Sequence, residues 1–495
     1  MTDASETAPL RQSAANSVQR YIDQTPIWPD GTAVREAPMT AMQWRIWTLA
    51  AAGKFFEGFV VFMTGVAMPL IAEEFHINQT EHGLVGAASL FGILVGAIGL
   101  GGMADYFGRK PMFVAEMLIF MVFLCLLVIS PNFFWLVVFL FGVGVALGCD
   151  YPTANLIISE SIPSAVRGRL VLSAFGFQAF GALTGTAVGF VILNNMPEIG
   201  AWRWMYATAI IPGAIVTVGR FFITESPQWL FSRNRVDEAE RQTARLLRRE
   251  PVFPHEVKLD TGDAAHQERR RRRPSYAALF NDKHRLATIL ASVPWFLQDL
   301  GTYGIGIFTP TILASLLGQK TTHAHSVAGV ISNDVLAAKG AALIDVLLIV
   351  GIVVAVLLAD RVSRITLQIA GFIGCAVGLL MAAFSSVASG GVQTGLLFAG
   401  FMLFNFMTNL GPNAQTYLLA GEVFPTHVRG MGAGFAAAFA KIGAVITAFL
   451  FPILLADIGT TALLLILVVT SLVGAVVTWV FRIETTGVNL EEIGR

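Results

Sequence analysis

Charged side chains are scarce in this sequence. Of its 495 residues, only 13% are Asp, Glu, Lys or Arg, whereas soluble proteins carry about 25%. This shortage excludes an ordinary water-soluble globular protein. The hydrophobic share of 55% points to lipid as the surrounding medium.

Cysteines and catalytic motifs are also lacking. The chain has 3 cysteines, Cys125, Cys149 and Cys375, and their spacing fits neither a disulfide framework nor a metal site. The sequence contains no G-x-x-x-x-G-K-[ST] loop that would bind a nucleotide, which leaves ion gradients as the energy source. Because no set of nucleophile, base and orienting residue emerges, we expect neither an enzyme nor a cofactor.

Long apolar runs are what the sequence has in abundance. Each run is roughly 20 residues, which lets a helix cross about 30 Å of hydrocarbon. A helix suits lipid because it satisfies its own backbone polar groups, and the short alternating segments of a β-barrel are missing. The sequence predicts an all-α membrane protein with twelve spans, at approximately 44–72, 81–104, 110–130, 133–158, 168–194, 202–223, 285–315, 335–359, 364–387, 393–419, 430–453 and 459–482.

The two halves of the chain carry similar motifs. The pattern Glu-x-x-Pro-x-x-x-Arg-Gly begins at Glu160 and again at Glu422, so that Arg167 and Arg429 correspond. Similar halves are typical of a secondary transporter that rocks one half against the other around a central site. We predict a cytoplasmic tail (1–43), an N-terminal six-helix bundle (44–224), a cytoplasmic linker with short amphipathic helices (225–283), a C-terminal six-helix bundle (284–482) and a cytoplasmic tail (483–495).

Basic residues mark one side of the membrane. They occupy alternate loops, among them the loop with Arg109 and Lys110 and the segment 225–283. The positive-inside rule therefore places these loops and both termini in the cytoplasm, for an inner or plasma membrane. The unbroken run from Arg269 to Arg273 is interpreted as part of this loop signal, and we expect no nucleic-acid partner.

The loop after the second span resembles a motif of the major facilitator superfamily. Residues 101–110 follow that superfamily's G-x-x-x-D-[RK]-x-G-R-[KR], except that Tyr106 stands where a base is usual. The segments that begin at Glu225 and Glu484 resemble the sugar-porter-like branch. Charge clusters at such loops can lock one packing of two bundles, although they could also serve only to fix the topology. The predicted gating residues are Asp105, Arg109, Glu160, Arg167, Glu422 and Arg429.

Ionisable residues inside apolar spans are costly in lipid, so each one is a functional hypothesis. The spans contain Lys54, Glu57, Asp150, Asp299, Asp345 and Lys441. Trp295, Asp299 and Tyr303 follow at intervals of four residues and share one helix face. Lys54 and Glu57 lie one turn apart and could be a structural ion pair, and the role of Asp345 stays open between function and structure.

A second resemblance concerns the polar residues of the spans. The sequence Gly-x-Asp-Tyr-Pro at 148–152, Gln178, Trp295 to Tyr303, Gly-Pro-Asn at 411–413 and Lys441 resemble the phosphate:proton symporter family. They resemble in part bacterial relatives of the synaptic-vesicle-glycoprotein type, which include carriers of nicotinate and other organic anions. The resemblance implies a substrate pocket of Tyr151, Gln178, Trp295, Asp299, Tyr303, Asn413 and Lys441, and proton traffic through Glu57, Asp150 and Asp299.

One departure from the phosphate family bears on the substrate. That family has an Asp-x-x-Asp pair in the first span, where this chain has Glu57 and Val60 with an additional Lys54. We therefore predict a monomeric, proton-coupled symporter of a small anionic solute, either phosphate or an organic anion such as nicotinate or an aromatic acid. A sugar or polyol carrier is the alternative that the end motifs favour. A non-transporting receptor or sensor is the alternative of a different class.

Overall fold

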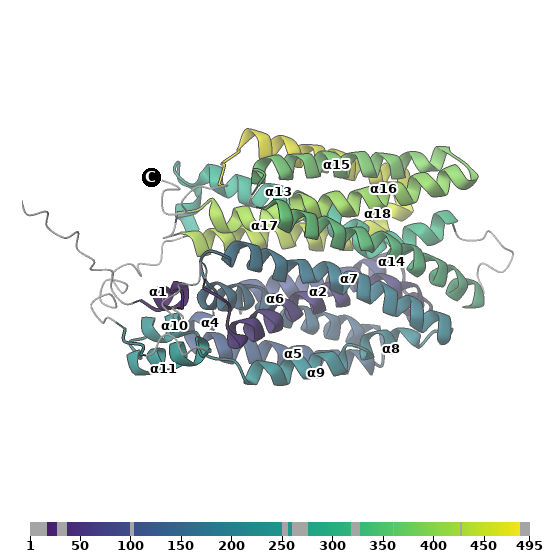
Figure 1. The fold of residues 1–495 in the computed structure, drawn as a ribbon. Coiled ribbons are helices and arrows are strands. Elements are labelled where there is room, and N and C mark those ends of the chain that lie inside the picture. The colour runs from purple at the N-terminus through teal and green to yellow at the C-terminus, as the bar shows by residue number, and fades with distance from the viewer. Residues whose placement is uncertain are drawn as a thin grey trace, which may run out of the picture.

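The structure is a computed structural model. It describes residues 17–26, 37–99, 103–249, 256–259, 276–317, 327–359, 361–425 and 428–485. The described residues form helices and connecting turns without any β-strand. The helices gather into two bundles that lie one above the other in Figure 1. The predicted all-α fold class is confirmed.

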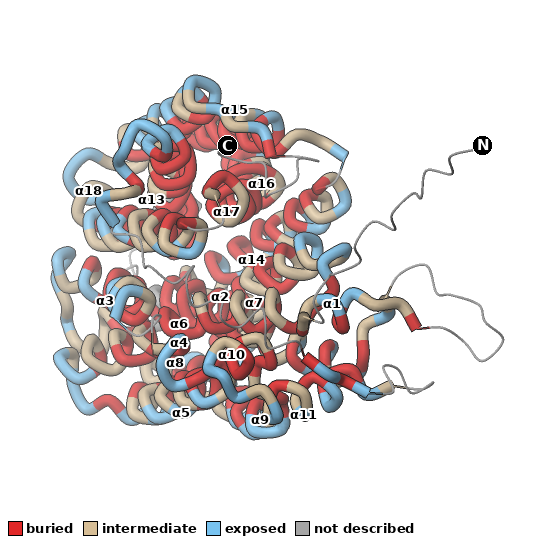
Figure 2. Tube along the Cα trace, turned by 90° about the vertical axis from the view of Figure 1, so that its left-hand side faces the viewer, coloured by how far each residue is buried: buried red, intermediate tan, exposed pale blue. Residues whose placement is uncertain are grey.

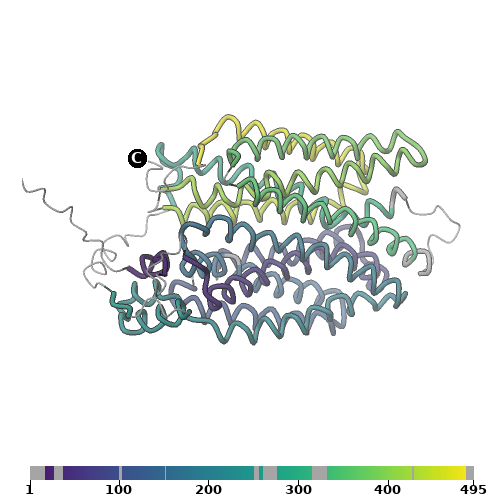
Figure 3. Tube along the Cα trace, viewed as in Figure 1, coloured from purple at the N-terminus to yellow at the C-terminus, as the bar shows by residue number. Residues whose placement is uncertain are grey.

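The N-terminal bundle, coloured from purple to teal in Figure 3, provides the first six crossings. Five of them are single helices, and the sixth is a pair of shorter ones. In chain order they are α2 (Ala41–Phe75), α3 (Gln79–Gly99), α5 (Arg109–Val128), α6 (Phe133–Ser161), α7 (Arg167–Asn195) and the pair α8 (Ala201–Ala207) and α9 (Ile210–Phe221), with the short α4 (Met103–Phe107) between α3 and α5.

The C-terminal bundle provides the remaining crossings. Its helices are α13 (Arg285–Leu317), α14 (Val327–Leu358), α15 (Arg364–Phe384), α16 (Gly390–Leu410) with α17 (Pro412–Glu422), and α18 (Arg429–Val480), together with two single turns, η1 (Tyr276–Phe280) and η2 (Ser385–Val387). Gly459, with a φ of 77°, interrupts α18 and separates its last two crossings. The described chain thus has the predicted twelve crossings.

The tenth crossing is interrupted where the sequence predicts it. Gly411 has φ −106° and ψ −105°, outside the helical region, and Pro412 begins α17. Proline has no N–H to continue the ladder of α16. A break of this kind is tolerated within a membrane only where the freed backbone groups face protein or a wet cavity.

Short helices gather at one end of the N-terminal bundle, which we call the motif end. They are α1 (Val18–Asp23), α10 (Pro227–Ser232) and α11 (Val236–Leu246), and they share a small hydrophobic core with the adjoining ends of α2 and α6. The predicted cytoplasmic tail thus contains a helix, α1, that is attached to the N-terminal bundle. The backbone N–H of Ser164, which follows α6, donates to the carboxylate of Asp23 at 2.7 Å. Tyr21 donates its hydroxyl to the backbone oxygen of Lys258 at 3.0 Å.

Glycines bring the two bundles into close contact at the end opposite to the motif end. A Cβ atom built on Gly65 would lie 2.1 Å from the backbone oxygen of Ile307, and one on Gly83 would lie 2.3 Å from that of Phe449. Small residues permit such close approach of helices in membranes. Near the motif end, a Cβ on Gly434 would meet no atom within 4 Å. Helices of the two bundles thus approach each other closely at Gly65 and Gly83, whereas Gly434 at the other end faces open space.

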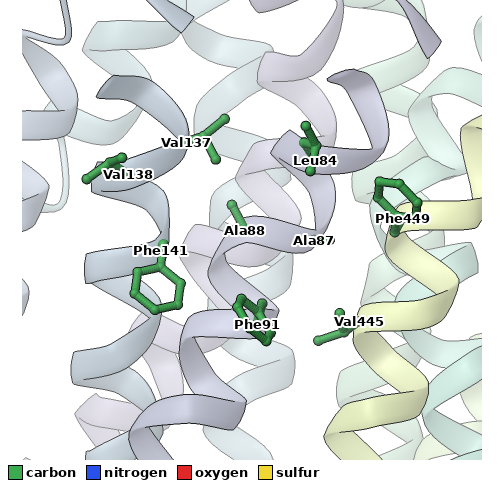
Figure 4. Close-up of a pocket in the computed structure, with 9 residues that line it drawn as sticks. All are labelled: Leu84, Ala87, Ala88, Phe91, Val137, Val138, Phe141, Val445 and Phe449. Carbon is green, nitrogen blue, oxygen red and sulfur yellow. The ribbon is translucent and has the colours of Figure 1, made fainter. Parts of the chain in front are cut away.

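Two further features lie along the boundary between the bundles. Figure 2, which looks along the helices from the motif end, shows α7 and α14 side by side there. A groove of about 430 Å³ opens where α3 and α6 meet α18 (Figure 4). Its lining is entirely apolar, and consists of Leu84, Ala87, Ala88, Phe91, Val137, Val138, Phe141, Val445 and Phe449. Such a surface suits lipid chains and offers no polar partner to a charged solute.

Candidate functional site

A buried network of polar side chains joins the two bundles at their centre. Its members come from α2, α7, α13 and α18, and they are Lys54, Glu57, Gln178, Asp299, Tyr303 and Lys441. Five of them are less than 9% exposed, and Gln178 is partly buried. The structure therefore brings together six side chains that the sequence places on four separate helices.

Lys441 is the hub of the network on the side of the C-terminal bundle. Its ammonium nitrogen lies 3.2 Å from Oδ2 of Asp299 and donates to the hydroxyl of Tyr303 at 2.6 Å. The same nitrogen lies 4.4 Å from the centre of the Tyr303 ring. One turn of α13 separates Asp299 from Tyr303, so a single lysine on α18 reaches both groups.

Glu57 is the hub on the side of the N-terminal bundle. Its Oε2 pairs with the ammonium group of Lys54 at 2.6 Å. Its Oε1 accepts from Tyr303 at 3.2 Å and from Gln178 at 3.3 Å, and it lies 3.8 Å from the nitrogen of Lys441. The bonds from Tyr303 and Lys441 cross from one bundle to the other, so relative motion of the bundles must alter them.

The network balances its formal charges. Two carboxylates, Glu57 and Asp299, face two ammonium groups, Lys54 and Lys441, so the buried site carries no net charge when all four are ionised. Isolated charges are very costly to bury, and pairing reduces this cost. Adding an anion to the network must therefore be accompanied by a positive charge if the balance is to be kept.

Aromatic side chains lie beside the network. The ring of Tyr417 stacks on Phe175 at a centroid distance of 4.6 Å and meets Trp295 edge-on at 6.2 Å. Trp295 and Tyr303 lie on the same helix, α13, and both are buried. Phe175 comes from α7 and Tyr417 from α17, so this wall also crosses the bundle boundary.

Asn413 and Tyr151 are two other predicted pocket residues. Asn413 donates to Oδ1 of Asn409 at 2.7 Å, and Asn409 donates in turn to the backbone oxygen of Leu348 at 2.9 Å. These bonds tie the broken tenth crossing to α14. The backbone of Tyr151 lies in α6, but its side chain falls outside the described part of the structure.

Asp150 belongs to a second buried cluster, inside the N-terminal bundle. Its Oδ1 pairs with Arg220 of α9 at 2.6 Å, and Arg220 also pairs with Glu116 of α5 at 2.7 Å. The guanidinium group lies 3.5 Å from the centre of the Phe113 ring and donates to the backbone oxygen of that residue at 2.7 Å. The ion pair of Asp150 thus lies in this second cluster, although the resemblance groups Asp150 with the central network, and its carboxylate packs against Gly53 of α2, the neighbour of Lys54.

Glu116 and Arg220 are absent from the ionisable residues that we selected from the sequence. Both lie inside predicted spans, at 110–130 and 202–223, so the rule that selected Asp150 would also have selected them. Their pairing depends on how α5, α6 and α9 pack, and this cannot be read from spacing along the chain. Asp345, which we did select, lies at the boundary between α14 and α7, away from both clusters.

The motif residues form an equivalent clamp in each half. Arg109 donates to both carboxylate oxygens of Glu160, at 3.1 and 3.0 Å, and Ser226 donates to the same carboxylate. In the second half, Arg364 donates to both oxygens of Glu422 at 3.3 Å. There, Thr485 donates to Glu422 at 2.6 Å. Each clamp joins helices of one bundle only.

The other predicted gating residues lie around these clamps. Asp105 pairs with Arg109 at 2.9 Å, and its carboxylate is more than half exposed. Arg167 donates to the backbone oxygen of Ile162 at 3.5 Å, and the corresponding Arg429 donates to that of Phe424 at 3.1 Å. The two arginines thus hold equivalent turns, at the ends of α6 and α17.

Glu225 fastens the start of α5 to the loop before α10. One of its oxygens accepts from the backbone N–H groups of Arg109, Lys110 and Ser226, at 3.0, 3.1 and 2.8 Å. Burial of the carboxyl raises the pKa of Glu225, and the backbone donors oppose this shift. The segment that begins at Glu225, which resembles the sugar-porter-like branch, therefore connects the start of α5 to the loop before α10.

Comparison with known proteins gives three consistent findings. The model of the family "Sugar (and other) transporter" matches residues 46–495. A putative inorganic phosphate transporter of Schizosaccharomyces pombe is 26% identical, over 85% of this chain and 82% of that protein. The niacin transporter NiaP of Acinetobacter baylyi is 25% identical, over 93% of this chain and 98% of that protein.

The fold is also found among solved structures. The proton:xylose symporter XylE of the major facilitator superfamily, bound to 6-bromo-6-deoxy-D-glucose, superimposes with a TM-score of 0.71. The alignment covers 92% of this chain and 98% of that protein at 19% sequence identity. At this identity the comparison establishes the two-bundle architecture.

Proposed function

This chain belongs to the sugar (and other) transporter family of the major facilitator superfamily, and on this premise we propose that it is a proton-coupled symporter of a small anionic solute. It is a multi-pass membrane transporter of a small molecule, and not an enzyme. The proposal adds the coupling ion and the charge of the solute. The central network supports both additions.

The observation that carries the proposal is the position of Lys441 between Asp299 and Tyr303. In the network, Asp299 supplies the nearest carboxylate to the ammonium group, at 3.2 Å. A proton on Asp299 would neutralise this carboxylate and leave the buried positive charge of Lys441 poorly compensated. At an effective dielectric constant of about 20, two unit charges about 4 Å apart interact by about 4 kcal/mol. An anion that replaces the lost carboxylate recovers energy of this order.

Proton and anion are therefore expected to bind with positive cooperativity. Each ligand strengthens the other by the same factor, as linkage requires. A carrier that binds both ligands or neither can change between its two bundle packings with a full or an empty site. Symport requires this behaviour. The bonds from Tyr303 and Lys441 to Glu57 connect this event to the bundle boundary.

Lys54 explains why the proton is assigned to Asp299 and not to Glu57. Glu57 has an ammonium partner of its own at 2.6 Å and two neutral donors, which together favour its ionised form. Among the described residues, the side chain of Asp299 has one hydrogen-bonding and ion-pairing partner, Lys441. The additional lysine, by which this chain departs from the phosphate family, thus concentrates the coupling on one carboxyl.

The proposed solute is phosphate or an organic anion such as nicotinate or an aromatic acid. The phosphate and niacin transporters among the relatives support anions of both kinds. The wall of Phe175, Trp295 and Tyr417 offers apolar area to a flat organic acid. A sugar or polyol is the second candidate, because the network is neutral as a whole and a neutral solute leaves its charges unchanged.

The remaining assignments rest on the sequence. We place the protein in an inner or plasma membrane as a monomer, with the motif end and both termini in the cytoplasm, since the basic loops lie at that end. The motif residues are proposed to influence the balance between the two bundle packings through the shape of each bundle at the motif end, since each clamp lies within one bundle.

Uptake into proteoliposomes under an imposed proton gradient tests the proposal. Labelled phosphate, nicotinate, an aromatic acid and xylose are compared, each with and without a protonophore. We expect one of the anions to accumulate and the protonophore to stop it. Accumulation of xylose alone would favour the sugar carrier. Binding without gradient-driven accumulation of any solute would favour the receptor.

A further inference from the structure

Asp345 is a buried carboxyl at the boundary between the two bundles. It lies near the middle of α14 and is 3% exposed. Its Oδ2 lies 3.2 Å from the hydroxyl oxygen of Thr186, on α7 of the other bundle. Its Oδ1 accepts from the side-chain amide of Asn405, on α16, at 3.1 Å. One carboxyl thus contacts both bundles.

No base compensates this carboxyl among the described residues. Asp345 forms no ion pair there, and its hydrogen-bond partners are a hydroxyl and an amide. The helix α16 has no charged residue. The other helices packed against α14 are α2, α7 and α13. Together with α14 itself, they carry the following titratable or charged residues: Arg45, Lys54, Glu57, Glu73, Glu74, Arg167, Arg169, Arg285, Asp299, Tyr303, Asp334 and Lys339. None of these residues forms an ion pair or a hydrogen bond with Asp345. An uncompensated carboxylate in such a position favours its neutral form.

The hydroxyl of Thr186 determines how a proton can be held. Its oxygen lies 3.2 Å from the backbone oxygen of Ala182 and 3.1 Å from that of Leu183, besides the contact with Asp345. A hydroxyl has one hydrogen and two lone pairs, so it can donate to only one of these three acceptors. Threonine in a helix commonly donates to the backbone oxygen one turn earlier.

Two hydrogen positions therefore satisfy the same set of atoms. When Asp345 is protonated on Oδ2, the acid donates to Thr186, and Thr186 donates to its own helix backbone. When Asp345 is ionised, Thr186 turns its hydrogen toward Oδ2. In both cases Asn405 donates to Oδ1. The site changes between the two by gain or loss of one proton and rotation of one hydroxyl.

We propose that Asp345 is a second proton-binding site, whose acid proton is donated across the bundle boundary to Thr186 while α7 and α14 are packed together. The reaction is the addition of one proton to a carboxylate and its reversal, without a co-reactant. Separation of the two helices removes Thr186 and admits water, which stabilises the ionised form and releases the proton. Binding of this proton thus depends on the packing of the bundles and not on the solute. The inference rests on the proposed function only for the assumption that the bundles separate.

Infrared difference spectroscopy of the purified protein, recorded as the pH is raised, detects the site without any transport. A protonated buried carboxyl gives a carboxylic acid C=O band, whose position depends on the hydrogen bond of its O–H group. We expect Asp345→Asn to remove one such band from the spectrum. Thr186→Val, which keeps the volume but removes the acceptor, is expected to shift that band, and Thr186→Ser to restore its position.

The controls separate this site from other acids. Asp334→Asn, on the same helix, and Asp299→Asn, in the central network, should leave the band that responds to Thr186→Val in place. If Asp345→Asn fails to fold, the pair Thr186→Val and Thr186→Ser still decides the question. A spectrum that Asp345→Asn or Thr186→Val leaves unchanged would overturn the proposal. Wild-type accumulation in Asp299→Asn with this band intact would overturn the coupling role of Asp299 and leave the proposal for Asp345 standing.

Discussion

The two buried charge clusters of this protein each bring two carboxylates together with basic side chains, but they differ in their bases and in the bundles that supply them. The central network combines two carboxylates and two lysines from both bundles. The second cluster combines Glu116, Asp150 and Arg220, all from the N-terminal bundle. One spans the boundary between the two bundles, and the other lies within a single bundle.

This difference indicates what each cluster can do. Rocking of the bundles changes distances such as that from Tyr303 to Glu57, but it leaves the pairs of Arg220 with its acids unchanged. The central network can therefore respond to a conformational change, whereas the second cluster is suited to holding α5, α6 and α9 together. Proton traffic through Asp150, which the resemblance implies, stays a prediction, and its contact with Arg220 makes a structural contribution as well.

The largest expected effect is that of Asp299→Asn. The amide keeps the shape of the side chain but cannot take up a proton, so the solute loses its coupling to the gradient. We expect accumulation under a proton gradient to fall to the level of protein-free liposomes. Exchange of labelled for unlabelled solute at equal pH, which needs no net proton movement, should continue. Accumulation at the wild-type level would show that another group carries the proton.

Arg220→Met tests the opposite side of the comparison. The substitution leaves the carboxyls of Glu116 and Asp150 buried without their base, and breaking a buried pair costs about 3–5 kcal/mol of stability. We expect a marked loss of thermal stability in detergent. The conservative variant Glu116→Gln leaves Asp150 paired with Arg220, so its loss of thermal stability should be much smaller.

The transport properties of these two variants sharpen the test. Folded Arg220→Met protein should retain the same dependence of uptake on pH as the wild type, since its cluster does not span the boundary. A shift of that pH dependence in Glu116→Gln, whose fold is expected to persist, would move the second cluster from a structural role into the coupling mechanism.

Much of the fold can be predicted from the sequence, because a membrane permits few backbone structures. Apolar runs of span length gave the crossings, and Gly411 with Pro412 gave the break in the tenth. The separation of the last two crossings was also predicted, between 453 and 459, and the structure interrupts α18 with a turn at Gly459, whose φ is 77°. Local composition does not reveal how such a turn aligns two helices.

The site was predictable by type of residue and less so by contact. Rare ionisable groups in apolar runs identified Lys54, Glu57, Asp299 and Lys441, and the structure places these four together. Which acid faces which base depends on the rotation and packing of helices, and so the partner of Asp150 was missed. The same rule applied to every apolar run would have added Arg220 to the candidates.

Lys441→Gln is expected to have an intermediate effect, on affinity. A hydrogen bond to a charged group contributes about 1.5–3 kcal/mol, so anion binding should weaken by about ten- to a hundredfold. The increase in affinity expected at lower pH should also diminish. In the variant, protonation of Asp299 no longer leaves the positive charge of Lys441 without its carboxylate partner. Solute affinity measured at two pH values in both proteins provides the test. A neutral sugar bound equally well by wild type and variant would overturn the anion proposal.

The smallest expected effect lies at the motif end, where charges are exposed to water. The Asp105 carboxylate is 55% exposed, and such exposed pairs contribute about 0.2–1 kcal/mol. Asp105→Asn should therefore favour opening of the motif end only slightly. Alkylation of a cysteine introduced at Gly434, in a chain without its native cysteines, reports that opening, and we expect a modest increase in rate. Arg109→Gln removes a guanidinium that is 8% exposed and bound to Glu160, and it should increase the rate further. Equal and unchanged rates in both variants would show that these residues do not influence the balance between the two packings.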